Sequence, residues 1–221
     1  MGTIMVISDD ALIKRFKYAN GTLKNKYHET DAAKLRFIEY KVVNQRLVWL
    51  LNHHDQLTIQ SFSELVKIHQ FLFTPIYAWA GEVRDYELSK GDTEFMLSPA
   101  IAKGIDHVNH LLAQINKQTK PTAMDYAQLL DSLNYLHPFR EGNGRATKAF
   151  IQLLAANHGQ ELRFNRQDEL VIRALAAADL AVLADFIQLK PVGSKQAVIQ
   201  KISAELEKKG QHYQTYRPPR R

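Results

Sequence analysis

The sequence reads HPFREGNGRATK at residues 137–148, between two segments whose apolar residues repeat with helical spacing. Gly142 and Gly144 flank Asn143, so the backbone there can adopt conformations closed to other residues and can approach a ligand closely. A helix is expected to begin at Asn143, and the free N–H groups and positive dipole end of a helix start favour an anion. This stretch therefore predicts a phosphate-binding turn between two helices.

Charged and titratable side chains around the turn extend this prediction. Arg145 and Lys148 stand three residues apart, hence on one face of the helix, and add two positive charges near its start. A carboxylate at Glu141 is ill placed beside these cations unless it faces a divalent ion such as Mg²⁺, which prefers a carboxylate plus phosphate oxygens. The imidazole of His137, with a reference pKa of about 6.5, can accept a proton near neutral pH.

The same stretch resembles the signature of the Fic (Fido) family, His-x-Phe-x-Asp/Glu-Gly-Asn-Gly-Arg-x-x-Arg. Every specified position matches except the last, where Lys148 stands in place of arginine. Upstream, LKNKYHETDAAKL at 23–35 is similar to the start of many Fic cores, and IYAWAGEVRDYELSKGDTEF at 76–95 is similar to the segment leading into their target-docking flap. The resemblance covers residues 20–190.

The resemblance implies a protein adenylyltransferase, an enzyme that transfers AMP from ATP to a Ser, Thr or Tyr hydroxyl of a target protein and releases diphosphate. It implies that His137 is the base that deprotonates the hydroxyl and that Glu141 holds Mg²⁺. The implied phosphate ligands are Gly142, Asn143 and Gly144 around the α-phosphate, Arg145 at the outer phosphates and Lys148 at the γ-phosphate. Lys90 and Gly91 are implied to lie in the flap over the site and, with Asp92, to pair main chain to main chain with an extended segment of the target.

The departure at Lys148 has a physical consequence. Arginine offers a planar fork for two parallel hydrogen bonds, whereas lysine offers a point charge. We therefore expect this protein to retain ATP binding with a looser orientation of the nucleotide.

Two other functions stay open at this point. Some Fic relatives transfer a different phosphate-containing group, although Asn143-Gly144-Arg145 favours AMP transfer because the phosphorylating Doc branch has Asn-Lys-Arg there. The chain is alternatively a nucleotide-binding interaction module without turnover. An intact His137 argues against that alternative, since a protein that no longer catalyses the reaction does not need a catalytic base.

The rest of the chain predicts an all-α fold with one β-hairpin flap. Apolar periodicity and capping residues predict a helix over 31–53 with Thr30 or Asp31 as its cap, a helix beginning at Ser61 with Glu64 in a capping box, and a helix beginning at Ser98. Further helices are expected over 122–135, over 143–158 with Gly159 at its end, as two short helices before 190, and over 194–209. Between 84 and 96, short alternating segments around Lys90-Gly91-Asp92 predict the hairpin.

Composition narrows the class of protein further. The 221 residues are 45% hydrophobic and 24% charged, as in an ordinary globular chain, and without cysteine they hold neither disulfides nor thiolate metal sites. Five of the six net positive charges lie in residues 208–221, so the body is nearly neutral and nucleic-acid binding is disfavoured. No run is long enough to span a membrane and no leader pattern is present, so we expect a cytoplasmic protein.

We expect four parts along the chain: an N-terminal extension at 1–19, a Fic domain at 20–190, a C-terminal helix at 191–210 and a basic tail at 211–221. The C-terminal helix carries Ser203 and Glu207, which fit the first part of the inhibitory pattern Ser/Thr-x-x-x-Glu-Gly/Asn of many Fic proteins, but Lys208 occupies its last position. A solvent-facing amphipathic helix is the simpler interpretation. The alternative hypotheses are that Glu207 reaches Lys148 and blocks the γ-phosphate, or that a separate antitoxin-like protein restrains the enzyme.

Overall fold

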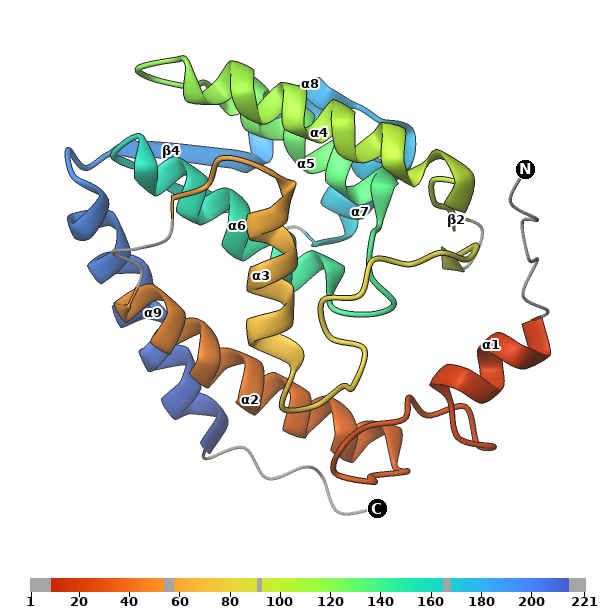
Figure 1. Ribbon diagram of the computed structural model, residues 1–221. Coiled ribbons are helices and arrows are strands. Elements are labelled where there is room, and N and C mark those ends of the chain that lie inside the picture. The colour runs from red at the N-terminus through yellow and green to blue at the C-terminus, as the bar shows by residue number, and fades with distance from the viewer. Residues whose placement is uncertain (1–8, 54–57, 91–92, 165–167, 215–221) are drawn as a thin grey trace.

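The computed structural model describes residues 9–53, 58–90, 93–164 and 168–214, and its chain is mostly helical (Figure 1). The short strands form two antiparallel pairs, β1 with β2 and β3 with β4. Among the described helices, none combines the length and the apolar character that crossing a bilayer requires. In order, the elements are α1 (Asp9–Phe16), α2 (Ala32–Asn52), α3 (Phe62–Phe73), β1 (Ser89–Lys90), β2 (Thr93–Glu94), the 3₁₀ turn Ser98–Ala100, α4 (Ile101–Asn116), α5 (Ala123–Leu136), α6 (Asn143–Asn157), β3 (Gln160–Phe164), α7 (Asp168–Ala177), α8 (Leu180–Phe186), β4 (Ile187–Pro191) and α9 (Lys195–Gln214).

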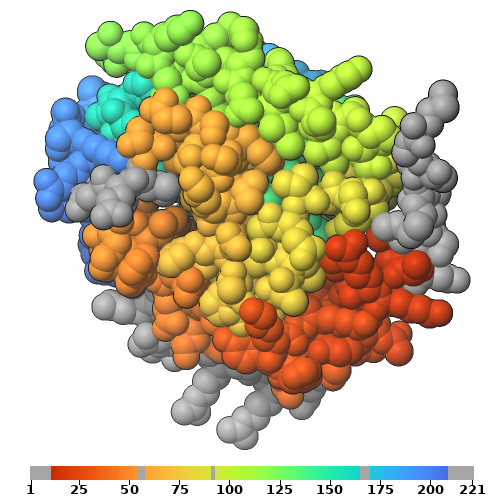
Figure 2. Space-filling model, in the orientation of Figure 1, coloured from red at the N-terminus to blue at the C-terminus, as the bar shows by residue number. Residues whose placement is uncertain are grey.

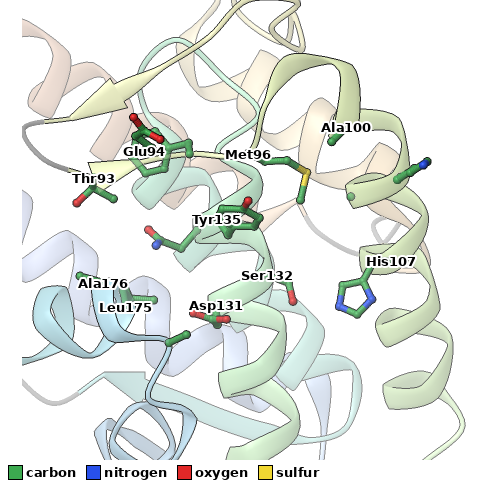
Figure 3. A pocket seen from close by; sticks show the side chains of 15 residues that line it. Thr93, Glu94, Met96, Ala100, His107, Asp131, Ser132, Tyr135, Leu175 and Ala176 are labelled. Atoms are coloured by element: carbon green, nitrogen blue, oxygen red, sulfur yellow. The ribbon is translucent and has the colours of Figure 1, made fainter.

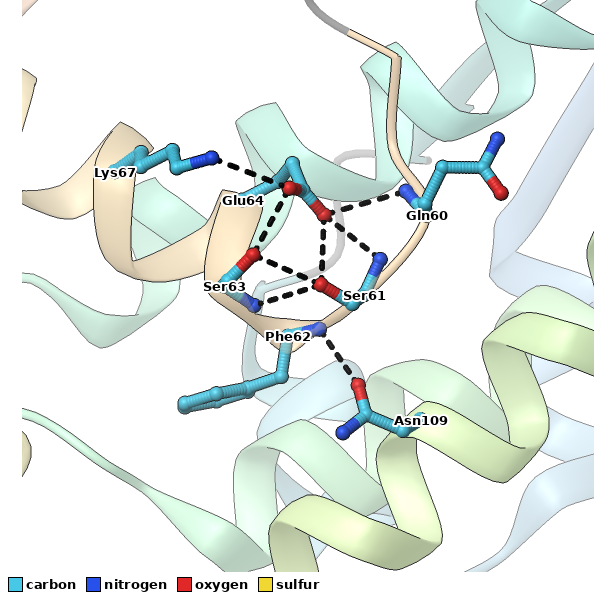
Figure 4. A network of polar contacts seen from close by, with 7 residues as sticks. All are labelled: Gln60, Ser61, Phe62, Ser63, Glu64, Lys67 and Asn109. Atoms are coloured by element: carbon cyan, nitrogen blue, oxygen red, sulfur yellow. Dashed lines mark hydrogen bonds and ion pairs between the residues drawn. The ribbon is translucent and has the colours of Figure 1, made fainter.

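Side-chain caps fix where the predicted helices begin. The Asp31 carboxylate accepts the Ala33 and Lys34 N–H groups at the start of α2. At the start of α3, the Ser61 hydroxyl and the Glu64 carboxylate form the predicted capping box (Figure 4). These contacts satisfy N–H groups that have no partner inside a helix, and they confirm two of the predicted starts.

The core is built around α6, against which α3, α5, β3 and α9 pack. Helix α6 is buried on nearly all sides, with Phe150, Leu153 and Leu154 fully inaccessible to solvent. Helix α3 packs its buried face, including Leu65 and Leu72, against it. On the face seen in the space-filling view, α2, α3 and α4 lie beside the segments that precede α2 and that join α3 to α4 (Figure 2). The helix that begins with the predicted phosphate-binding turn is thus largely buried in the core.

Helix α9 lies along α2. The Ser203 hydroxyl is buried and donates to Asn52 Oδ1 at 2.8 Å, and Asn44 Nδ2 donates to the Leu206 carbonyl at 3.3 Å. The helix predicted at 194–209 is confirmed and extends to Gln214.

The β-hairpin is confirmed, with Lys90 paired to Thr93, while its tip residues Gly91 and Asp92 lie outside the described residues. The single-hairpin prediction was incomplete, because β3 and β4 form a second antiparallel pair in which Leu162 lies opposite Leu189. These strands have five residues each and are separated by two helices in the sequence, so their pairing is a non-local contact that periodicity does not reveal.

Candidate active site

The loop 137–142 is shaped by two left-handed residues and one side chain. His137 ends α5 with φ +41°, and Gly142 caps α6 with φ +85°. The buried Asn143 side chain accepts the Phe139 N–H at 2.9 Å and donates to the Phe139 carbonyl at 2.7 Å. Because both ends of its amide are used inside the loop, the Asn143 side chain shapes the turn, and only its backbone N–H remains for a ligand.

A pocket of about 450 Å³ opens over this loop, within the range typical of small-molecule sites. One end of the pocket is polar and is formed by the loop and the start of α6. The other end is apolar and is formed by α7 and the end of β3. Residues lining the polar end include Lys90, His137, Glu141, Gly142, Asn143, Gly144 and Lys148, and those lining the apolar end include Phe164, Val171, Ile172 and Leu175.

His137 is held as a neutral base. Its ring stacks on Phe95, with centroids 3.6 Å apart, and its Nδ1 lies 3.2 Å from the Asn134 carbonyl. A carbonyl can only accept, so Nδ1 carries the proton and Nε2 is the acceptor of the ring. Burial, aided by the charges of Arg84 and Lys90, lowers the pKa of His137 to about 4. At neutral pH the imidazole is therefore unprotonated and able to take up a proton.

The start of α6 forms an anion cradle. The first helical hydrogen bond runs from Ala146 N–H to the Gly142 carbonyl, so the three amides before Ala146 have no partner inside the helix. A Cβ added at Gly144 would meet no atom within 4 Å, whereas one added at Gly142 would lie 2.4 Å from Phe73 Cζ. Gly144 thus keeps backbone N–H groups accessible from the pocket, and Gly142 permits the turn that aims them there.

Glu141 lies at the edge of this cradle. Its side chain is 46% exposed, and its Oε1 accepts the Gly142 N–H at 3.0 Å. No cluster of three or more His, Asp or Glu side chains able to hold a metal ion occurs within the part of the chain that the structure describes. One accessible carboxylate beside a phosphate cradle fits Mg²⁺, which takes few protein ligands when it also binds phosphate oxygens.

Arg145 pairs with two carboxylates. Its Nη2 lies 2.7 Å from Glu39 Oε1 on α2 and 3.4 Å from Glu141 Oε1, and its guanidinium packs over the ring of Phe73. Arg145 is not among the residues that line the pocket. The structure therefore brings together most of the predicted site residues but directs this arginine toward a buried carboxylate.

The remaining predicted cations differ in their surroundings. Lys148 is exposed, lines the pocket and has its Nζ 5.7 Å from the centre of the Phe164 ring. Lys90 lines the pocket from β1. Gly91, the other predicted flap residue, lies outside the described residues.

Two site residues were not predicted from the sequence. Arg84 is 3% exposed and donates to four carbonyls, those of Tyr86, Met96, Leu136 and His137, so it ties both arms of the flap to the end of α5. His69 is fully buried, accepts the Gly81 N–H at Nδ1 and donates from Nε2 to the Glu141 carbonyl, both at 2.9 Å. His69 lies on the buried face of α3 beside Leu65 and Leu72, so the apolar spacing of that helix is a sequence signal for it. Arg84 lies in the loop before the flap and has no such signal.

A second hollow, of about 600 Å³, lies on the other side of the flap (Figure 3). Glu94 of β2, Tyr135 and Asp131 of α5, and His107 of α4 border it. Phe95 and Asn134 line both this hollow and the pocket at His137, so the two spaces adjoin across the flap.

Glu207 is exposed on α9, and the described residues show no contact between Glu207 and Lys148. Its neighbour Glu205 instead pairs with Arg163 of β3. The self-inhibition hypothesis gains no support from these positions and stays a prediction.

Residues 59–155 of this chain match the model of the Fic/DOC family. A protein adenylyltransferase of Bartonella henselae is 28% identical over 181 residues, covering 72% of this chain and 33% of the relative. The protein adenylyltransferase VbhT of Bartonella schoenbuchensis is 34% identical over 104 residues, covering 45% of this chain and 22% of the relative. The chain thus spans a third or less of the length of these two relatives.

The fold is also that of solved Fic structures. The BepC effector of Bartonella tribocorum, solved with bound AMPPNP, superposes with a TM-score of 0.66 at 24% identity, covering 80% of this chain and 98% of that chain. Agreement at this level establishes the helical Fic fold, including its small antiparallel hairpins.

Proposed function

The chain contains a Fic/DOC-family domain, and on that premise we propose that it is a protein adenylyltransferase that transfers AMP from ATP to a hydroxyl of a target protein. The observation that carries the proposal is the neutral imidazole of His137 in the same pocket as the cradle at the start of α6. A base and a polyanion site in one pocket are what transfer of a phosphate-containing group to an alcohol requires.

The two ends of the pocket suit the two parts of ATP. The apolar end, with Phe164 and Val171, suits the base, and the cradle before Ala146 suits the α-phosphate. Lys148 suits an outer phosphate as a point charge.

In the proposed reaction His137 Nε2 accepts the proton of the target hydroxyl as its oxygen bonds to the α-phosphorus. The bond from the α-phosphorus to the bridging oxygen breaks, and diphosphate leaves. Positive charge at the cradle stabilises negative charge that develops on the phosphate oxygens, and the enclosed loop holds the groups in place. Mg²⁺, when bound, would neutralise phosphate charge, and Glu141 is the residue that would hold it.

We propose that the acceptor segment approaches from the β2 side of the flap. With ATP in the pocket at His137, the adjoining hollow beside Glu94 and Tyr135 is the open route to the imidazole. An extended segment there can pair with the flap main chain on the β2 side. Lys90, which was predicted to pair with the target, lies instead on β1 and lines the pocket assigned to ATP.

Purified protein incubated with a cell lysate and either α-labelled or γ-labelled ATP tests the proposal. AMP transfer retains label from the α position only. Retention from the γ position only would show phosphorylation, and AMPPNP binding with no retained label would show a binding module. The His137→Ala variant is the control, because it removes the base and leaves the cradle intact.

A further inference from the structure

Glu39 is a buried carboxylate that the proposed chemistry does not use. It lies on α2, outside the segment that matches the Fic/DOC family, with Leu35 and Val43 one turn away on the same buried face. Only 8% of its side chain is exposed, and burial raises its pKa while Arg145 opposes that rise. A carboxylate at such a position needs a cation to compensate for its lost hydration.

Arg145 is that cation, and it is shared. The same atom, Arg145 Nη2, lies 2.7 Å from Glu39 and 3.4 Å from Glu141. The shorter contact is also the more buried one, since the Glu141 side chain is 46% exposed. A short contact away from water outweighs a longer one that water screens, so Glu39 is the dominant partner of Arg145.

The division matters for Glu141. An arginine free to pair fully with Glu141 would compete with any cation for its carboxylate oxygens. Held by Glu39 and packed over Phe73, Arg145 makes one long contact to Oε1, where Gly142 N–H also donates. The carboxylate is oriented by these donors, yet it stays accessible at the edge of the pocket.

We propose that Glu39 is a positioning residue that holds Arg145 in place and thereby keeps Glu141 available to a divalent cation. The inference rests on the proposed function, because it takes Mg²⁺ with nucleotide as the occupant of the site. It gives Arg145 a supporting role in place of the direct phosphate contact that the sequence resemblance implies. It also makes α2 part of the working site.

The test measures AMPPNP binding by calorimetry over a series of Mg²⁺ concentrations. In Glu39→Gln, Arg145 loses its buried anionic partner and shifts toward Glu141. We expect the Mg²⁺ concentration for half-maximal AMPPNP binding to rise roughly tenfold, the lower end of the effect of losing a residue that supports a metal ligand. AMPPNP affinity without Mg²⁺ should stay within about twofold of the wild type, because the cradle is unchanged. Glu82→Gln, which removes the exposed partner of Arg15, is the matched control and should change neither value.

A double variant separates this role from a purely structural one. Glu39→Met with Arg145→Met replaces the pair by apolar side chains, a change that buried ion pairs often tolerate. It removes the competing cation, so the Mg²⁺ dependence should return to within about threefold of the wild type. This variant also carries the test if Glu39→Gln does not fold.

Three results would overturn the inference. They are an unchanged Mg²⁺ dependence in Glu39→Gln, no recovery in the double variant, and tighter AMPPNP binding in Glu39→Gln, which would make Glu39 a restraint. If the wild type binds AMPPNP with Mg²⁺ but retains no α label, only the proposed function fails. If it binds no AMPPNP, both fail.

Discussion

The loop of residues 137–142 and the hairpin flap face each other across one pocket, yet they are built in opposite ways. The loop is held from inside by Asn143 and from behind by His69. The flap strands have two residues each, all four exposed, and are anchored at their base by Arg84. The loop, which presents the base and the cradle, is thus preorganised. The flap is a short strand pair that is anchored at its base.

The loop and the flap differ in how tightly their functional groups are held in position. Phosphoryl-type transfer depends on positioning and charge stabilisation, so the groups at the phosphates should be fixed before the nucleotide arrives. In the proposed reaction the flap binds the main chain of a target protein, and this contact needs a less rigid position than the phosphate contacts do.

The largest effect should come from His137→Ala. It removes the base while the start of α6 stays intact, so AMP transfer should fall by about 10² to 10⁴-fold. AMPPNP affinity, measured by calorimetry, should change by less than about threefold, since the lost group lies outside the cradle. A matching loss of affinity would show that His137 serves binding.

Gly142→Ala should break the loop itself. The residue has φ +85°, and a Cβ would lie 2.4 Å from Phe73 Cζ, so we expect a loss of about 2 to 4 kcal/mol in the free energy of unfolding. Gly144→Ala is the matched control, because its Cβ meets nothing within 4 Å and alanine is favoured in a helix by about 1 kcal/mol. That variant should keep its stability in urea denaturation but bind AMPPNP more weakly. Equal stability of the two variants would contradict this account of the turn.

The pH dependence of stability should report on His69. Burial, aided by the charge of Arg145, lowers its pKa to about 4, against about 6.5 in an unfolded chain. Because the folded value is the lower one, the stabilisation is complete above about pH 6.5 and is lost as the pH falls toward 4. The loss is on the order of 3 kcal/mol.

His69→Phe is the variant that isolates this contribution, because His137 still titrates in it. Urea unfolding at several pH values should show a smaller decline in stability between pH 7 and pH 4 than in the wild type. Parallel declines in the two proteins would mean that His69 does not bind its proton differently on folding.

A smaller change is expected for Lys148→Arg. A planar guanidinium can add one directed hydrogen bond to an outer phosphate, so ATP affinity should rise by up to about fivefold, the equivalent of about 1 kcal/mol. ADP affinity, which lacks the γ-phosphate, serves as the comparison and should rise less. If neither affinity nor turnover changes, Lys148 does not contact the phosphates.

The smallest effect should be that of Glu207→Gln. Its carboxylate is exposed on α9, so automodification should stay within about twofold of the wild type. A strong increase would revive self-inhibition through Glu207, and an unchanged rate leaves a separate inhibitory protein as the hypothesis to examine.

The features that were predicted correctly from the sequence are those set by contacts between residues close together in the chain. The caps at Asp31 and Ser61 and the glycine at 159 mark helix ends through contacts within a few residues, and all three are confirmed. The phosphate-binding turn was found for the same reason, because its glycines and the helix start are adjacent in the chain.

The sequence did not reveal the contacts that tertiary structure creates. Arg84 and Arg145 look alike in a sequence, and only packing assigns one to four carbonyls and the other to a carboxylate. Glu39 of α2 was also not predicted, although its position follows a pattern in the sequence. Glu39 lies one turn from Leu35 and one turn from Val43, and a charged residue in line with two apolar neighbours indicates a buried ion pair.

The pairing of β3 with β4 has a consequence for the variability of this fold. Phe164 lies opposite Ile187, so α7 and α8 form a segment whose two ends are held together by the strand pair, with Leu183 of α8 buried in the core against α5. Val171, Ile172 and Leu175 of that segment line the apolar end of the pocket. Under the proposed binding of ATP, exchange of this segment between homologous proteins should change the preference for the nucleobase, while the start of α6 stays unchanged.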